Sequence, residues 1–247
     1  MKKRTWKVIA VISFAAAVIL TAVVLRIYTQ REHARQTYEE MQQQNSEKRQ
    51  TDTQESKEQS KTKEKKKKLD IPVDFETLQK ENPDIYAWIT IPGTDIDYPV
   101  VQDSTDNTYY LNHAADTSLS DSGAIYSEKE NAKDFDDYLT VLYGHNMKDG
   151  SMFQGLHRFQ EESYLQEHNQ VYLYLPDNRE LVYKVIKCGY VKADSDTFWL
   201  GEQVETRTLL LSTCGSDSSK RLVLFCELPE KGEESETNGE DISIEVF

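Results

Sequence analysis

The chain has little cysteine, with only Cys188, Cys214 and Cys226 among 247 residues. Three thiols are too few for a scaffold built on disulfides, and the odd number leaves at least one cysteine unpaired within the chain. Positive charge is scarce beyond residue 68, because residues 69–247 hold 13 Lys and Arg against 35 Asp and Glu. Phosphate binding needs clustered Lys and Arg, so this acidic part is not expected to bind nucleic acid.

Long apolar runs are also rare, and the clearest is Val8–Leu25, which follows the basic segment Met1–Lys7. A helix of these 18 residues extends roughly 27 Å, enough for the core of a bilayer. A cleaved signal peptide is the alternative, but the run is long for one and no small-x-small cleavage site follows it. We therefore expect residues 1–28 to be a cytoplasmic basic end and a single-pass membrane anchor, with the remainder of the chain extracellular.

Residues 29–69 have few apolar side chains, since Gln, Ser, Thr, Glu and Lys dominate and the segment closes with Lys65–Lys68. Such a composition buries too little apolar surface to fold alone. The first part of this segment, Arg31 to Gln44, could alternatively form a polar helix. We interpret the lysine run as part of a solvated linker. The alternative is that it contacts an anionic membrane or wall polymer. We expect an extracellular tether that is largely disordered.

Short strand-like runs dominate residues 70–229, the expected folded domain, and an acidic C-terminal tail follows at 230–247. Asp74 is placed to cap a short helix, Phe75–Glu81, and Met152–His168 has the apolar spacing of an inserted helix. Many short strands with one inserted helix indicate a mainly β protein with a closed or nearly closed barrel. Apolar runs bounded by turn residues predict the strands near 87–91, 96–101, 124–127, 138–143, 170–175, 181–191, 208–213 and 222–228.

Cys214 ends the apolar run Thr208–Thr213, and Arg221 opens the returning run after the turn-like segment Gly215–Ser219. If this hairpin closes, Arg221 lies beside the thiol. A guanidinium there favours the thiolate form and offers donors to an oxyanion. The alternative is a buried structural cysteine at the end of a strand, which is a common setting for this residue.

His145 is the only one of five histidines that directly follows a strand-like run, which ends with Val141–Gly144. A cysteine nucleophile needs an acid–base partner, which can lie far away in the sequence. A single histidine is more often structural than catalytic, and no Asp or Asn is evident as a third member. His113, in a polar loop, is the next candidate.

These motifs resemble the signature of the sortase family, specifically class B. The resemblance rests on Thr208–Cys214 with the following Arg221 and on Tyr143–Met147, and it extends to Asn82–Ile89 and Tyr98–Gln102. It implies an eight-stranded sortase-type β-barrel with one or more N-terminal helices and one inserted helix, preceded by a transmembrane helix.

By this resemblance the protein is a cysteine transpeptidase in which Cys214 is the nucleophile, His145 the acid and base, and Arg221 a donor to the oxyanion or substrate backbone. It would cleave surface proteins after Thr in a C-terminal sorting signal, Asn-Pro-x-Thr-like or related, and transfer them to a peptidoglycan or lipid-linked precursor amine. We expect no cofactor and no metal ion. Weaker candidates for the substrate cleft are Ser212, Tyr143, Asn107 and Leu111.

Several alternatives stay open. The interval from Cys214 to Arg221 is shorter than is typical of the class, so Lys220 is an alternative to Arg221. The same residues would serve a sortase that polymerises pilins through a lysine side chain. A papain-like peptidase would need its nucleophile at the start of a helix, whereas Cys214 ends a strand. In a non-catalytic, membrane-tethered interaction domain, Cys214, His145 and Arg221 would be unrelated in space.

Overall fold

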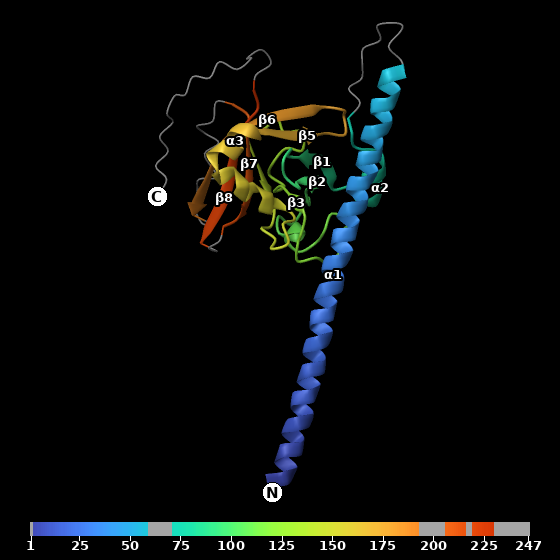
Figure 1. The fold of residues 1–247 in the computed structure, drawn as a ribbon, viewed down its shortest axis with the longest axis vertical. Coiled ribbons are helices and arrows are strands. Elements are labelled where there is room, and N and C mark those ends of the chain that lie inside the picture. Colours follow the sequence, from blue (N-terminus) through green and yellow to red (C-terminus); the bar gives the residue numbers. More distant parts are fainter. Residues whose placement is uncertain (1, 59–70, 193–205, 216–218, 230–247) are drawn as a thin grey trace.

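The structure, a computed structural model, describes residues 2–58, 71–192, 206–215 and 219–229. Its centre is a closed barrel of eight strands in the order β1-β2-β3-β4-β7-β8-β6-β5 (Figure 1). All eight predicted strands are therefore confirmed. They are β1 (Ile85–Thr90), β2 (Asp97–Val101), β3 (Ile125–Tyr126), β4 (Leu139–Tyr143), β5 (Gln170–Tyr174), β6 (Glu180–Lys192), β7 (Thr208–Cys214) and β8 (Lys220–Glu227).

Two pairs in the barrel are parallel, β2 with β3 and β4 with β7, and the other pairs are antiparallel. A parallel pair needs a long crossover between its strands. Between β4 and β7 this crossover contains β5, β6 and two short helices, so strands far apart in the sequence become neighbours. The parallel pairing matters for function, because β4 and β7 end at the same rim of the barrel.

The short helices follow local rules. Helix α2 (Phe75–Glu81) begins after Asp74, whose side chain accepts a hydrogen bond from the Thr77 amide, as predicted. The single helix expected at Met152–His168 is instead a 3-10 helix, η2 (Phe153–Gln160), followed by α3 (Glu162–Glu167). Glu161 between them has extended backbone angles, φ −82° and ψ 116°, which interrupts the helical ladder. A further 3-10 turn, η1 (Tyr109–Leu111), precedes β3.

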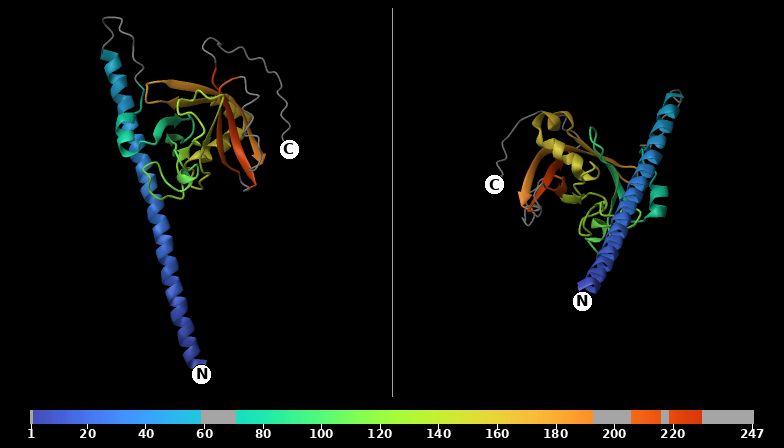
Figure 2. Two further views of the ribbon diagram at one scale, coloured as in Figure 1. Left: turned by 180° about the vertical axis from the view of Figure 1, so that it is seen from behind. Right: turned by 60° about the horizontal axis from the view of Figure 1, so that its bottom comes forward.

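The long helix α1 (Lys2–Glu58) differs from the expected disordered tether. It continues without a break from the apolar run as far as Glu58, and the barrel packs beside its C-terminal half (Figures 1 and 2). The polar helix considered for Arg31 to Gln44 is thus present. It is stabilised by tertiary contact, because Ala34, Tyr38 and Met41 are buried. The rest of the tether and the acidic tail, residues 59–70 and 230–247, lie outside the described residues.

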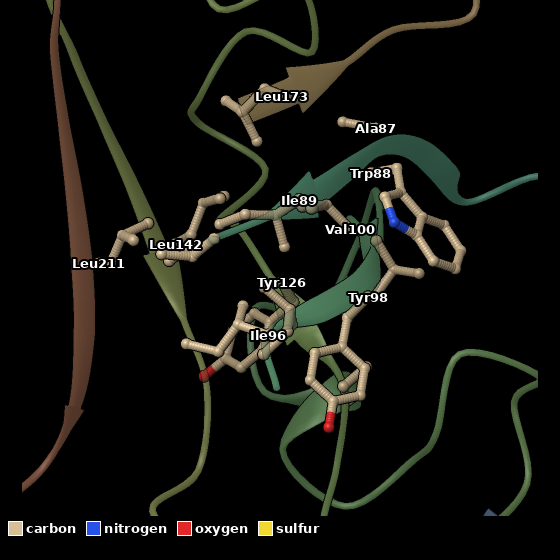
Figure 3. Packing of buried hydrophobic residues seen from close by; sticks show 14 of the residues in the cluster. Ala87, Trp88, Ile89, Ile96, Tyr98, Val100, Tyr126, Leu142, Leu173 and Leu211 are labelled. Carbon is tan, nitrogen blue, oxygen red and sulfur yellow. The ribbon is translucent and has the colours of Figure 1, made fainter. Parts of the chain in front are cut away.

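The main core fills the barrel and continues under α1 and α2. In Figure 3, Ile89 of β1 points toward Leu142 of β4 and Leu211 of β7, whereas Trp88 points away from them. This alternation is the period-two pattern of a strand. Trp88 is also fully buried, because the α1 side of β1 and β2 is covered as well. Its indole nitrogen donates to the Asp97 carboxylate at 2.7 Å. The core thus fixes both faces of β1.

Candidate active site

Strands β4 and β7 bring His145 and Cys214 to the same rim of the barrel. Their parallel register pairs Tyr143 with Ser212, and the Gly144 amide extends it by donating to the Ser212 carbonyl at 3.1 Å. His145 and Cys214 each come two residues after this pair. The Asn146 side chain closes the edge by donating to the Cys214 carbonyl at 3.1 Å. The backbones of the two candidate catalytic residues therefore lie at neighbouring positions although 69 positions separate them in the sequence.

Arg221 enters from the other neighbour of β7. The antiparallel register of β7 and β8 sets Cys214 directly opposite Arg221, and the Gly215 amide donates to the Lys220 carbonyl at 3.0 Å. Arg221 is half-buried, whereas Lys220 is exposed. Because successive side chains on a strand point to opposite faces, Lys220 does not share the face of Arg221. This geometry favours Arg221 over Lys220 as the cation beside the thiol.

Outward-facing side chains continue this face along the barrel. On β7, Leu210 and Ser212 precede Cys214 at alternate positions. Leu210 packs with Val141 of β4 and Val223 of β8 in a small apolar cluster that is separate from the main core. All three side chains of this cluster are buried, so the outer side of β4, β7 and β8 is a packed layer here and not an open surface.

The imidazole of His145 is held by the backbone of the preceding loop. Its Nε2 lies 2.8 Å from the Leu111 carbonyl oxygen. A carbonyl oxygen only accepts hydrogen bonds, so Nε2 carries a proton, and in the neutral ring Nδ1 is the nitrogen left to accept one. The Leu111 carbonyl therefore takes the orienting place that a carboxylate or amide occupies in other triads. The sequence does not indicate this contact, because every residue has a backbone carbonyl and no residue type marks the one that binds His145.

Tyr126 of β3 is a second member of the site that the sequence did not indicate. Its ring stacks on Tyr143 with the centroids 5.4 Å apart. Burial raises the pKa of Tyr126 to about 12, with smaller effects from Glu128, from Arg221 and from Cys214. The phenol is thus within electrostatic reach of Cys214 and Arg221 and stays protonated at neutral pH.

The four weaker candidates have different surroundings. Tyr143 is half-buried on the Cys214 face, and Leu111 is 41% exposed at the loop whose carbonyl binds His145. Ser212 is buried, and its hydroxyl has no hydrogen-bond partner among the described residues. Asn107 hydrogen-bonds with Glu130 and with the Lys129 amide. These bonds link Asn107 to the turn after β3 rather than to Cys214 or His145.

The other two thiols are poor nucleophile candidates. Cys188 and Cys226 are free and lie within β6 and β8. Burial raises the pKa of Cys188 to about 12, and it raises the pKa of the fully buried Cys226 further. The thiolate is the nucleophilic form, so both thiols are inert at neutral pH.

His113, the alternative histidine, is engaged elsewhere. Its ring stacks on Tyr109 with the centroids 4.0 Å apart, and its Nδ1 hydrogen-bonds with the Tyr109 carbonyl oxygen at 2.8 Å. Both contacts are local to the loop before β3. His145, at the rim beside Cys214, remains the better acid–base candidate.

This arrangement defines a class of protein: a closed β-barrel with a cysteine, a histidine and an arginine at the ends of three adjacent strands at one rim. The sortase-domain family model matches residues 89–229, which is more than half of the chain. The chain therefore belongs to the sortase family, whose members are cysteine transpeptidases.

Curated relatives and solved structures agree on class B. The chain is 43% identical to sortase B of Listeria monocytogenes over 95 residues, a match that covers 38% of each protein. It is 28% identical to sortase B of Staphylococcus aureus over 184 residues, covering 62% of this chain and 74% of the relative. The crystal structure of Clostridium perfringens sortase B has a TM-score of 0.56 and 28% identity, covering 64% of this chain and 100% of that one.

Proposed function

We propose that the protein is a membrane-anchored sortase that cleaves a C-terminal sorting signal and transfers the released protein to a peptidoglycan amine. The observation that supports this proposal is the strand register, which pairs Cys214 with Arg221 and pairs Tyr143 with Ser212, two residues before His145 and Cys214. Three residues that are unrelated in space would instead fit a non-catalytic interaction domain.

The first half-reaction forms a thioacyl enzyme. The Cys214 sulfur bonds to the carbonyl carbon of Thr in an Asn-Pro-x-Thr-like signal. The peptide C–N bond that follows this Thr breaks. Nδ1 of His145, the ring nitrogen not occupied by the Leu111 carbonyl, takes the thiol proton as the sulfur attacks and then donates it to the leaving amine. Arg221 donates to the developing oxyanion or to the substrate backbone, where its planar fork of donors suits two acceptors.

The second half-reaction transfers the acyl group. An incoming amine attacks the thioacyl carbon, gives its proton to His145, and the C–S bond breaks to restore the Cys214 thiolate. We propose a peptidoglycan or lipid-linked precursor amine as the acceptor.

The membrane anchor is part of the same proposal. Within the described residues, one helix is long and apolar enough to cross a membrane, and it lies near the N-terminus. The basic residues before Val8 favour a cytoplasmic N-terminus, which leaves the barrel on the outer side where sorting signals and wall amines meet.

The test is a transpeptidation assay with the full chain in detergent micelles. Fluorescent peptides carrying Asn-Pro-x-Thr-type signals are incubated with and without an amine acceptor, and products are identified by mass. The proposal predicts cleavage after Thr and a ligated product that needs the acceptor, both absent from Cys214→Ala. Ligation only to a lysine peptide would support pilin polymerisation, and no cleavage of any signal would contradict the proposed enzyme.

A further inference from the structure

One segment of α1, residues 31–46, docks on the barrel. Its buried side chains are Ala34, Tyr38, Met41 and Asn45, whose spacing places them on one face of the helix. Polar contacts flank this face at both ends. Arg31 pairs with Asp121, and Asn45 accepts from the Asp74 amide at 3.3 Å. The docked segment is therefore an integral part of the folded domain.

Tyr38 has the closest connection with the loop before β3. Its hydroxyl donates to the Gly123 carbonyl at 2.8 Å and accepts from the Ala115 amide at 3.1 Å. Its ring meets Tyr98 edge-on with the centroids 5.3 Å apart. Burial raises the pKa of the phenol well above its usual range, so the hydroxyl remains a donor at physiological pH.

Gly123 lies beside the His145 ring, with no room for a side chain between them. It has a φ of +57°, and a Cβ added there would lie 3.1 Å from Cδ2 of His145 and 2.8 Å from the Leu111 carbonyl oxygen. That carbonyl is the group that accepts from Nε2 of His145. The Tyr38 hydroxyl thus binds the carbonyl of a residue that lies beside both the imidazole and its hydrogen-bond acceptor.

A second set of contacts connects Tyr38 with the same histidine. The hydroxyl of Tyr98, which packs against Tyr38, accepts from the Met152 amide at 3.2 Å. Met152 forms a bridge with Asn146, and the Phe153 amide donates to the His145 carbonyl at 3.0 Å. The His145 ring therefore lies beside the Gly123 loop, and the His145 backbone binds the segment at Met152 and Phe153. Tyr38 contacts the first directly and the second through Tyr98.

We propose that Tyr38 is a positioning residue for His145, and that the docked segment of α1 completes the active site rather than only spacing it from the membrane. The role of His145 in catalysis rests on the proposed function, but the positioning itself does not. Loss of the Tyr38 hydroxyl releases the Gly123 carbonyl, and the imidazole then samples orientations in which Nε2 is no longer held by Leu111.

Gln42 provides a matched control on the same helix. Its side chain also donates to a backbone carbonyl of the barrel, that of Asp97 at 2.7 Å. Asp97 begins β2, and its carboxylate binds Trp88 and Thr90 rather than the His145 loop. If the docked segment contributes only to stability, loss of the hydrogen bond of Tyr38 and loss of that of Gln42 should have similar effects on activity.

The experiment compares Tyr38→Phe and Gln42→Leu in the full chain in detergent micelles. Tyr38→Phe keeps the ring and its packing, so the fold is retained. Small displacements of a catalytic group cost up to about 100-fold in rate. We expect kcat to fall about 10- to 100-fold in Tyr38→Phe with KM for the signal peptide unchanged, and both constants to stay within about two-fold of normal in Gln42→Leu.

A spectroscopic measurement separates this inference from the proposed function. In ¹⁵N-histidine-labelled full chain, the His145 ring signals, assigned by their loss in His145→Asn, report the tautomer. We expect the pattern of a proton fixed on Nε2 in the unsubstituted chain and in Gln42→Leu, and a mixed pattern in Tyr38→Phe. Unchanged ring signals and kcat in Tyr38→Phe, or equal losses in both variants, would overturn the inference. A chain that turns over no peptide would contradict the proposed function alone, because the ring signals still decide the positioning role.

Discussion

Cys214 and Arg221 are direct partners across the antiparallel pair of β7 and β8. Seven positions separate them in the sequence, yet the register gives them the same place on adjacent strands. Side chains of such a pair point to one face of the sheet, with Cβ atoms about 4.5–5.5 Å apart. The register therefore puts the Arg221 side chain on the same face of the sheet as the thiol.

The first prediction concerns donor geometry at Arg221. Loss of one oxyanion donor typically costs ~10²–10³ in rate, so Arg221→Ala should lose activity by about this factor. Arg221→Lys should also lose much of it, because an ammonium keeps the charge but not the planar fork of donors. The measurement is the rate of thioacyl-enzyme formation by rapid quench.

Lys220→Ala is the matched control for this prediction, because Lys220 is exposed at the adjacent position. Its rate should stay within about two-fold of normal, as expected of a surface substitution. Near-normal rates for both Arg221 variants would remove Arg221 from the site, and a large loss in Lys220→Ala would assign the role to the lysine.

The second prediction concerns the acid–base group. His145→Ala should lower kcat by about 10²–10⁴, the usual contribution of general acid–base catalysis. His113→Ala should have little effect, since its ring is engaged with Tyr109. Steady-state kinetics of both variants test this, with circular dichroism as the fold control. A larger loss in His113→Ala than in His145→Ala would reverse the assignment.

The third prediction concerns packing beneath the histidine. A Cβ at Gly144 would lie 2.6 Å from Ile125 Cδ1 and 2.7 Å from the Phe153 ring. Overpacking of this kind costs about 1–3 kcal/mol, so Gly144→Ala should lower the free energy of unfolding by that amount. Denaturant unfolding of the isolated variant measures it.

Gly189 in β6 is the control for that substitution, because a Cβ there meets no atom within 4 Å. Glycine in a strand is destabilising relative to alanine, so Gly189→Ala should leave stability unchanged or slightly higher. Equal destabilisation by the two substitutions would contradict the packing explanation.

Much of the fold was predictable because its signals are local. The apolar runs that became strands are bounded by turn residues, and the cap at Asp74 depends on a contact three residues away. The split of Met152–His168 into η2 and α3 was not predictable, because the apolar spacing continues through Glu161 while the backbone becomes extended there.

The docked segment of α1 was missed for a different reason. Ala34, Tyr38 and Met41 form a sparse apolar stripe on an otherwise polar helix, and the surface that covers them comes from residues more than 50 positions later. Helical order there depends on tertiary contacts, which composition does not reveal.

The candidate site was predictable to the extent that it uses distinctive side chains at strand ends. Cys214, His145 and Arg221 could be chosen in this way, and the strand register brings their backbones together. The Leu111 carbonyl and the close approach of Gly123 are backbone features, and they become apparent only when the loop before β3 is seen against the His145 ring.

The most direct test of the account is intact-mass analysis of the full chain during turnover of a sorting-signal peptide without an amine acceptor. The account predicts a covalent adduct with the mass of the acyl fragment up to Thr, located on Cys214 by digestion. Addition of an amine should discharge the adduct as ligated product, and Cys214→Ala should form neither. Peptide cleavage by the folded Cys214→Ala variant, or an adduct on another residue, would contradict it.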